Sequence, residues 1–183
     1  MASPASSAPA PAPSTAARHP GAGRSALALV CFLAISFGVA ALGALSTIQN
    51  VDGWYAHADR AFWTPPNVVF GPIWTVLYTL MSVAAWLVWR EPAGRHRRAA
   101  LVVYIVQLVL NALWTPVFFG LYPVAGASAL WIALVIIAAI DVMVLVTMLR
   151  FWRVRRLAAV LLIPYWAWVL YATTLNLYLA LHN

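Results

Sequence analysis

The sequence predicts an all-α polytopic membrane protein, a bundle of five transmembrane helices. Of its 183 residues, 64% are hydrophobic and 8% are charged, whereas a soluble domain of this size carries about 25% charged residues. The apolar residues are gathered in five long runs that are separated by polar connections. About 20 helical residues cross the hydrocarbon layer of a bilayer, so each run is long enough to span it.

The first expected span covers residues 26–48 and follows Arg24. A cleavable signal peptide is the alternative for this segment, with Ala41, Gly43 and Ala44 as the small residues of a cleavage site, but its apolar core would be only about 7–15 residues long. We expect the other spans at residues 69–89, 99–119, 124–149 and 157–181. The Ala/Pro/Ser-rich residues 1–24 predict a disordered tail ahead of a membrane domain at residues 25–183.

The connection between the first two spans, residues 50–70, is much longer than the others. Pro65 and Pro66 prevent a helix from continuing through it. Long loops in compact proteins are usually functional or disordered. Aromatic residues within this loop predict that it packs against the bundle: Trp54, Tyr55, Phe62 and Trp63.

The arginines predict the orientation in the membrane. The chain has eleven arginines, no lysine and four acidic residues, which gives a net charge of +7. Such a charge is also found in nucleic-acid-binding proteins, but these arginines lie in short connections beside apolar runs and are typical of membrane-surface anchors. With five spans, ten arginines share one side with the N-terminus, and Arg60 alone lies on the other. The arginine-rich side is therefore expected in the cytoplasm, with the first loop and the C-terminus outside.

Three spans each carry a stripe of aromatic and polar side chains at helical spacing. In the third span, Gln107, Asn111 and Thr115 recur every four residues and so share one face, flanked by Tyr104 and Trp114. The other stripes are Tyr165, Trp168, Ala172 and Asn176 in the fifth span and Trp74 and Tyr78 in the second. These residues either join helices through interhelical hydrogen bonds worth about 0.6–2 kcal/mol each or line a pocket for a flat, apolar ligand.

Asp141 is a carboxyl group within the fourth span. Such groups are by default functional, and the alternative is a protonated or hydrogen-bonded structural acid. The chain has no Gly-rich phosphate loop, no His/Cys metal spacing and no nucleophile motif. Cys31 is the only cysteine, so no disulfide is expected. The sequence thus predicts neither a metal nor a required cofactor.

Three motifs follow one another along the chain: FWTPP and GPIWTVLY at residues 62–78, QLVLNALWTPVFFG at residues 107–120, and LIPYWAW with ATTLN at residues 162–176. In this order and spacing they resemble the TspO/MBR family, the tryptophan-rich sensory proteins and mitochondrial translocator proteins. The resemblance covers residues 25–183.

The resemblance implies a five-helix bundle, usually a homodimer, with a pocket that the first loop closes. Family members bind porphyrins and related tetrapyrroles, in some lineages steroids, and synthetic benzodiazepine-type ligands. A bacterial cytoplasmic membrane is the expected location. By motif position, the expected ligand-binding residues are Tyr55, Trp63, Pro65, Trp74, Asn111, Trp114, Trp168 and Ala172.

We therefore expect a membrane protein that binds a porphyrin or haem-type ligand as a sensor, scavenger or carrier. The macrocycle would lie between Trp63, Trp74 and Trp168, with a hydrogen bond from Asn111 and its propionates near Arg60. One alternative is an enzyme that degrades porphyrin with light and oxygen through Trp74 and Trp168. Another is a scaffold whose stripes bind a partner helix.

Two features bear on the details of this expectation. The cholesterol motif proposed for mitochondrial members needs a basic residue after a tyrosine, and none follows Tyr178. Small residues four apart in the first span, Ala34 with Gly38 and Ala40 with Ala44, are typical of helix dimers. The homodimer itself is expected from the resemblance.

Overall fold

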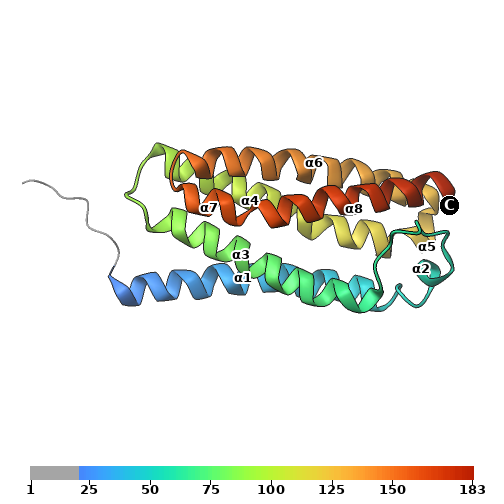
Figure 1. Ribbon diagram of the computed structural model, residues 1–183. Coiled ribbons are helices and arrows are strands. Elements are labelled where there is room, and N and C mark those ends of the chain that lie inside the picture. The colour runs from blue at the N-terminus through green and yellow to red at the C-terminus, as the bar shows by residue number, and fades with distance from the viewer. Residues whose placement is uncertain (1–20) are drawn as a thin grey trace, which may run out of the picture.

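The fold is a single elongated bundle of helices, as Figure 1 shows. The structure is a computed structural model that describes residues 21–183. Five helical segments in this part are long and apolar enough to cross a membrane, which confirms the predicted fold class. Most of the predicted tail, residues 1–20, lies outside the described residues.

The spans are α1 (Ala22–Ile48), α3 (Asn67–Arg90), α4 (Arg95–Thr115) with the π-helix η1 (Pro116–Gly120), α6 (Ala127–Trp152), and α7 (Arg156–Leu161) with α8 (Ile163–His182). Two short helices, α2 (Trp54–His57) and α5 (Tyr122–Ala125), lie in the connections. Residues 22–24, expected in the tail, are thus helical. The predicted start of the fourth span at residue 124 is wrong. The short helix α5 ends at Ala125, and Gly126, with a φ of 55° that glycine adopts readily, interrupts the helix before α6 begins at Ala127.

Prolines explain the two irregular spans. Pro116 has no N–H to donate to the preceding turn, so the chain widens into η1, where the Leu121 N–H reaches the Pro116 carbonyl at 3.1 Å. Pro164 likewise cannot continue an α-helical ladder, and the fifth span is divided at Leu162 into α7 and α8. Both breaks interrupt the regular α-helical hydrogen bonding without ending the span.

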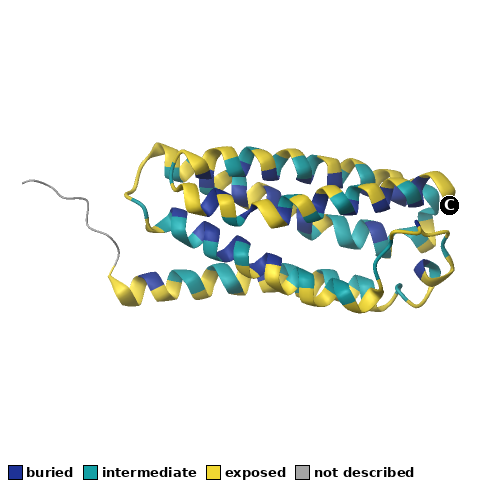
Figure 2. Cartoon of the chain, viewed as in Figure 1, coloured by how far each residue is buried: buried dark blue, intermediate teal, exposed yellow. Residues whose placement is uncertain are grey.

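The bundle is packed tightly at one end and is hollow at the other. The connections at residues 91–94 and 153–155 mark the tight end, here called the Arg-rich end, and the opposite end, which carries residues 49–66 and the C-terminus, is called the loop end (Figure 1). Small residues let the helices approach closely at the Arg-rich end, where these side chains have no exposed surface: Met81, Ala84, Ala85, Val88, Ala100, Phe151 and Ala158. Buried positions run along the facing sides of the helices (Figure 2).

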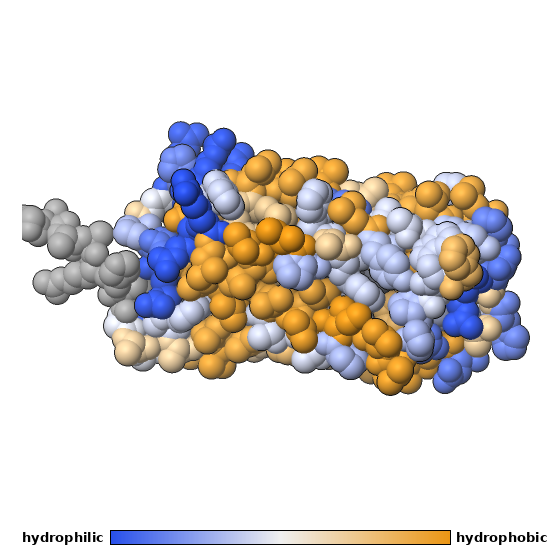
Figure 3. Space-filling view, in the orientation of Figure 1, coloured by the Kyte–Doolittle hydropathy of each residue, from blue (hydrophilic) through white to orange (hydrophobic). Residues whose placement is uncertain are grey.

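The outer surface matches a bilayer. Figure 3 shows a hydrophobic band around the middle of the bundle, with hydrophilic residues gathered at both ends. Large apolar side chains are exposed within the band, for example Val135 at 71% and Val76 at 57%. A soluble monomer would not leave so continuous an apolar surface in water. The protein is therefore an integral membrane protein.

Candidate ligand-binding site

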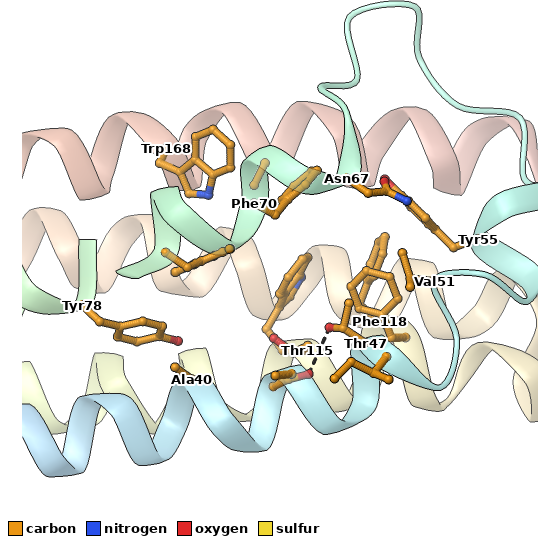
Figure 4. Close-up of a pocket in the computed structure, with 18 of the residues that line it drawn as sticks. Ala40, Thr47, Val51, Tyr55, Asn67, Phe70, Tyr78, Thr115, Phe118 and Trp168 are labelled. Carbon is orange, nitrogen blue, oxygen red and sulfur yellow. Dashed lines mark hydrogen bonds between the residues drawn. The ribbon is translucent and has the colours of Figure 1, made fainter. Parts of the chain in front are cut away.

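A cavity of about 530 Å³ lies inside the loop end of the bundle. Its walls come from the outer halves of α1, α3 and α8 and from the end of α4 with η1, and α2 covers it (Figure 4). Ligand pockets in proteins typically measure about 300–1,000 Å³, so the cavity is large enough for a drug-sized or larger molecule. Exposed residues such as Ile48 and Thr75 belong to the lining, so the cavity reaches the surface between α1 and α3.

Five of the eight expected binding residues lie together in this cavity: Tyr55, Trp74, Trp114, Trp168 and Ala172. The three tryptophan rings among them pack against neighbouring aromatic rings. The Trp74 and Tyr78 ring centroids are 5.3 Å apart, Trp114 stacks on Phe118 at 4.9 Å, and Trp168 meets Phe70 at 5.8 Å. These pairs hold the aromatic walls in place without a ligand.

Trp63 and Pro65 are outside the lining of the cavity. The Trp63 side chain is 37% exposed and packs edge-on against Tyr178 at 5.5 Å. Its carbonyl accepts a 2.6 Å hydrogen bond from the Tyr171 hydroxyl. Trp63 therefore anchors the loop to α8. The expected sandwich of a ligand between Trp63, Trp74 and Trp168 does not fit this arrangement.

Asn111 lies behind the cavity wall, in a buried chain of hydrogen bonds. The Tyr78 hydroxyl donates to Asn111 Oδ1 at 2.8 Å, and Asn111 Nδ2 donates to the Tyr165 hydroxyl at 2.7 Å. Tyr165 in turn donates to Gln107 Oε1 at 3.1 Å. The chain links α3, α4 and α8 across the bundle. The Asn111 amide is thus already engaged, and its placement is that of a structural link.

The first loop covers the cavity through α2. The Trp54 ring stacks on Tyr122 at 3.8 Å, and its Nε1–H donates to the Phe119 carbonyl at 3.0 Å. Tyr55 is buried, and burial raises the pKa of its phenol although the nearby Arg60 guanidinium opposes the rise. The expected packing is thus confirmed for Trp54 and Tyr55, but it is wrong for Phe62, which is 95% exposed.

The wall contributed by α1 was not expected from the sequence. Ala40, Ala41 and Ala44 face the cavity with Phe37 and Thr47. Ala40 and Ala44 are the pair that suggested a helix dimer, and here they leave space for a ligand. The run of small residues in a span of otherwise bulky side chains could have pointed to this wall. By itself, such a run indicates only that another group approaches the helix closely.

Family comparison agrees with the architecture and with the motifs in the site. The TspO/MBR family model matches residues 30–181 of the chain. The chain belongs to the TspO/MBR family. This assignment confirms the resemblance that the three motifs indicated.

Curated relatives carry the family names. The chain is 37% identical to the tryptophan-rich protein TspO of Archaeoglobus fulgidus over 85% of this chain and 94% of the relative. It is 40% identical to the tryptophan-rich sensory protein of Cereibacter sphaeroides over 79% and 84%. It is also similar to the human translocator protein, with 39% identity over 67% and 70% of the two chains.

This TspO/MBR cavity is apolar, and most of its polar groups are already bonded within the protein. Thr47 and Thr75 donate to carbonyls of their own helices at 3.0 and 2.9 Å, and Asn176 is held by Trp114 and by the Leu130 carbonyl. The buried Nε1–H of Trp168 has no partner among the described residues. Figure 4 shows the Trp168 ring nitrogen on the side of the cavity.

Proposed function

We propose that this TspO/MBR protein binds a tetrapyrrole of the porphyrin or haem type, or a similarly flat and apolar molecule, and acts as a sensor, scavenger or carrier. The observation that carries the proposal is the cavity of about 530 Å³ with indole and phenyl rings in its walls. Removing apolar ligand surface from water stabilises the complex by about 25 cal/mol per Å². A rigid macrocycle also loses little conformational entropy on binding.

Trp168 replaces Asn111 as the proposed polar contact. The Asn111 amide is engaged by Tyr78 and Tyr165, whereas Trp168 Nε1 is buried without a partner in the described part of the chain. A carbonyl or carboxylate oxygen of the ligand would accept this hydrogen bond once the Trp168 ring turns, because the Nε1 atom is buried in its present position. Arg60 lies 5.4 Å from the Tyr55 ring centroid on the loop, and we expect it to attract an acidic group that reaches the mouth of the cavity.

The proposal is tested by titrating protoporphyrin IX into the full chain in lipid nanodiscs and following tryptophan fluorescence. Trp168→Phe keeps the aromatic wall and removes the Nε1–H, so the dissociation constant should rise about 2- to 12-fold, the equivalent of one net hydrogen bond. Trp152→Phe is the matched control, because Trp152 is 52% exposed at the Arg-rich end. Unsaturable quenching, or equal affinities in all three proteins, would contradict the proposal.

Degradation of the bound porphyrin with light and oxygen is a second candidate function. Trp74, in the cavity wall, contacts Tyr78 at 5.3 Å and Tyr165 at 6.3 Å, and Asn111 links the two phenols. Oxidisable rings thus lead away from the proposed ligand position. A bilin-like absorbance that grows only under light and oxygen, and that disappears in Trp74→Phe, would favour this function. Stable porphyrin spectra in the wild type would exclude it.

The proposed setting is the cytoplasmic membrane of a bacterium, with the Arg-rich end inside the cell and the loop end outside. It follows from the ten arginines on one side and Arg60 alone on the other. Cysteine accessibility in intact cells, with single cysteines at residues 62 and 95 in a Cys31→Ser background, tests the orientation. The homodimer stays a prediction, which the mass of the protein in nanodiscs would check.

A further inference from the structure

Asp141 is an acidic residue in the middle of α6 that the proposed binding site does not use. It stands 14 residues after Ala127 and 11 before Trp152, which places it about 17–21 Å from either end of the helix. Its side chain is partly exposed on the apolar band of the bundle. No ion pair with Asp141 is found within residues 21–183. A carboxylate at this depth would be desolvated without a compensating cation.

The charged groups nearest in sequence or packing are far along the helix axes. Arg150 follows Asp141 by nine residues on α6, and His182 follows Thr173 by nine residues on α8. Arg95, Arg97 and Arg98 begin α4 at the Arg-rich end. The titratable group that interacts with Asp141 from a facing helix is the phenol of Tyr165. This phenol is itself hydrogen-bonded to Asn111 and Gln107.

The two short contacts of Thr173 Oγ1 each have a proton of their own only if Asp141 is protonated. Thr173 Oγ1 lies 2.8 Å from Asp141 Oδ2 and 3.0 Å from the Val169 carbonyl oxygen. A hydroxyl has a single proton to donate. Given to Val169, that proton leaves Thr173 free to accept one from Asp141. Both short contacts are then full hydrogen bonds, whereas with an ionised Asp141 the one hydroxyl proton would have to be shared between two acceptors.

The other carboxyl oxygen supports the same protonation state. Asp141 Oδ1 is buried and has no hydrogen-bond partner among the described residues. An unpartnered carbonyl oxygen of a neutral acid costs much less free energy than an unpartnered oxygen of an ionised carboxylate in hydrocarbon. Asp141 Oδ2 thus carries the proton that is donated to Thr173, and Oδ1 is a carbonyl oxygen without a hydrogen-bond partner.

We propose that Asp141 is a neutral carboxylic acid that donates its proton to Thr173, and that it is a modification site for hydrophobic carbodiimides. In this reaction the acid proton passes to a carbodiimide nitrogen and the carboxyl oxygen bonds to the central carbon. Rearrangement then gives a stable N-acylurea, so the whole reagent is added and no group leaves. Such reagents partition into the bilayer and need the protonated acid. Asp141 is partly exposed there, and because its Oδ1 is buried, the carboxyl group would react after a rotation of the side chain.

Infrared spectroscopy of the full chain in nanodiscs at neutral pH tests the protonation state. A carboxylic-acid C=O band should be present in the wild type and in Asp59→Asn, and lost in Asp141→Asn. Thr173→Val should keep the band and shift it, because the acid loses its acceptor. Absence of the band from the wild type, or its appearance only in Thr173→Val, would overturn the proposal.

Labelling with dicyclohexylcarbodiimide, followed by peptide mass spectrometry, tests the modification site in the wild-type protein. We expect an adduct on Asp141 and none on Asp52, Asp59 or Glu91, which lie outside the spans. Asp141→Asn should lose the label while retaining a donor toward Thr173. Labelling confined to the three other acids, or the same adduct yield in Asp141→Asn, would show that Asp141 is not this site.

Discussion

Asn183 and Asp59 are joined by two hydrogen bonds between a side-chain amide and a backbone. The Asp59 N–H donates to Asn183 Oδ1 at 2.9 Å, and Asn183 Nδ2 donates to the Asp59 carbonyl at 3.1 Å. The Asn183 amide thus pairs with the loop backbone as a neighbouring β-strand would, by accepting one hydrogen bond and donating another. Together with the bond from Tyr171 to the Trp63 carbonyl, it fastens the first loop to α8 and so holds α2 over the cavity.

Asn183→Ala should loosen this loop. Removal of the amide frees both backbone groups of Asp59 to bond with water, so we expect faster amide hydrogen exchange over residues 58–66 and faster release of a bound porphyrin. Hydrogen-exchange mass spectrometry and stopped-flow fluorescence measure the two effects. Leu181→Ala, an exposed site on the same turn of α8, should leave both rates unchanged. Unaltered exchange in Asn183→Ala would show that the loop is held by other contacts.

Asn111→Leu should lower stability more than it lowers ligand affinity. The leucine leaves the Tyr78 and Tyr165 hydroxyls without their amide partner. Since unmatched polar groups in membrane proteins find other partners in part, we expect a loss of about 1–3 kcal/mol. Thermal unfolding in detergent measures it, with Gln49→Leu, an exposed amide outside the cavity lining, as control. A Kd for porphyrin that rises more than in Trp168→Phe, without a loss of stability, would return Asn111 to the binding site.

Ala44→Leu should block the cavity while sparing the fold. Ala44 lines the cavity from α1, and the added carbons would occupy ligand space. Steric conflict of about 1–3 kcal/mol corresponds to an affinity loss of about 5- to 150-fold. Ala167→Leu, at an exposed site on α8, adds the same volume toward lipid and should bind normally. Equal binding by the two variants would place the ligand elsewhere.

Tyr55 makes the cover over the cavity sensitive to high pH. Burial raises the pKa of this phenol, so the folded loop favours the neutral form. The contribution of the neutral Tyr55 phenol to the stability of the folded loop is complete below the pKa of a free phenol, about 10. This contribution is lost as the pH rises through the raised pKa. Porphyrin release should therefore be constant near neutrality and accelerate above about pH 10. Tyr55→Phe should remove this acceleration, and phenolate absorbance would report the titration itself.

The spans and their order could be predicted because hydrocarbon thickness sets a minimum apolar length. The exact ends of the spans could not be predicted, since they depend on local interruptions of the helices. Gly126 separates α5 from α6 by adopting a positive φ, and an isolated glycine in an apolar sequence does not reveal that conformation. Pro116, similarly, signals a disturbance of the helix but does not specify a π-turn.

Helical spacing identified which residues face the interior of the bundle. It did not show whether such a residue lines the cavity or is buried behind the cavity wall. Asn111 and Trp114 stand three apart on α4, and both face inward. Trp114 reaches the cavity, whereas Asn111 is held behind it by Tyr78. The distinction depends on how neighbouring helices are spaced. One such close approach is at Gly43 of α1, where a Cβ would lie 3.3 Å from Thr115 Oγ1. Such interhelical separations are not encoded in the spacing of any one helix.

The close packing at the Arg-rich end, where Ala84, Ala100 and Phe151 have no exposed surface, turns the cavity into a cul-de-sac. A ligand bound as proposed would meet a closed floor and would have to leave by the route through which it arrived. In this conformation that route is the opening between α1 and α3 at the loop end. Transport to the opposite face would require the floor to come apart.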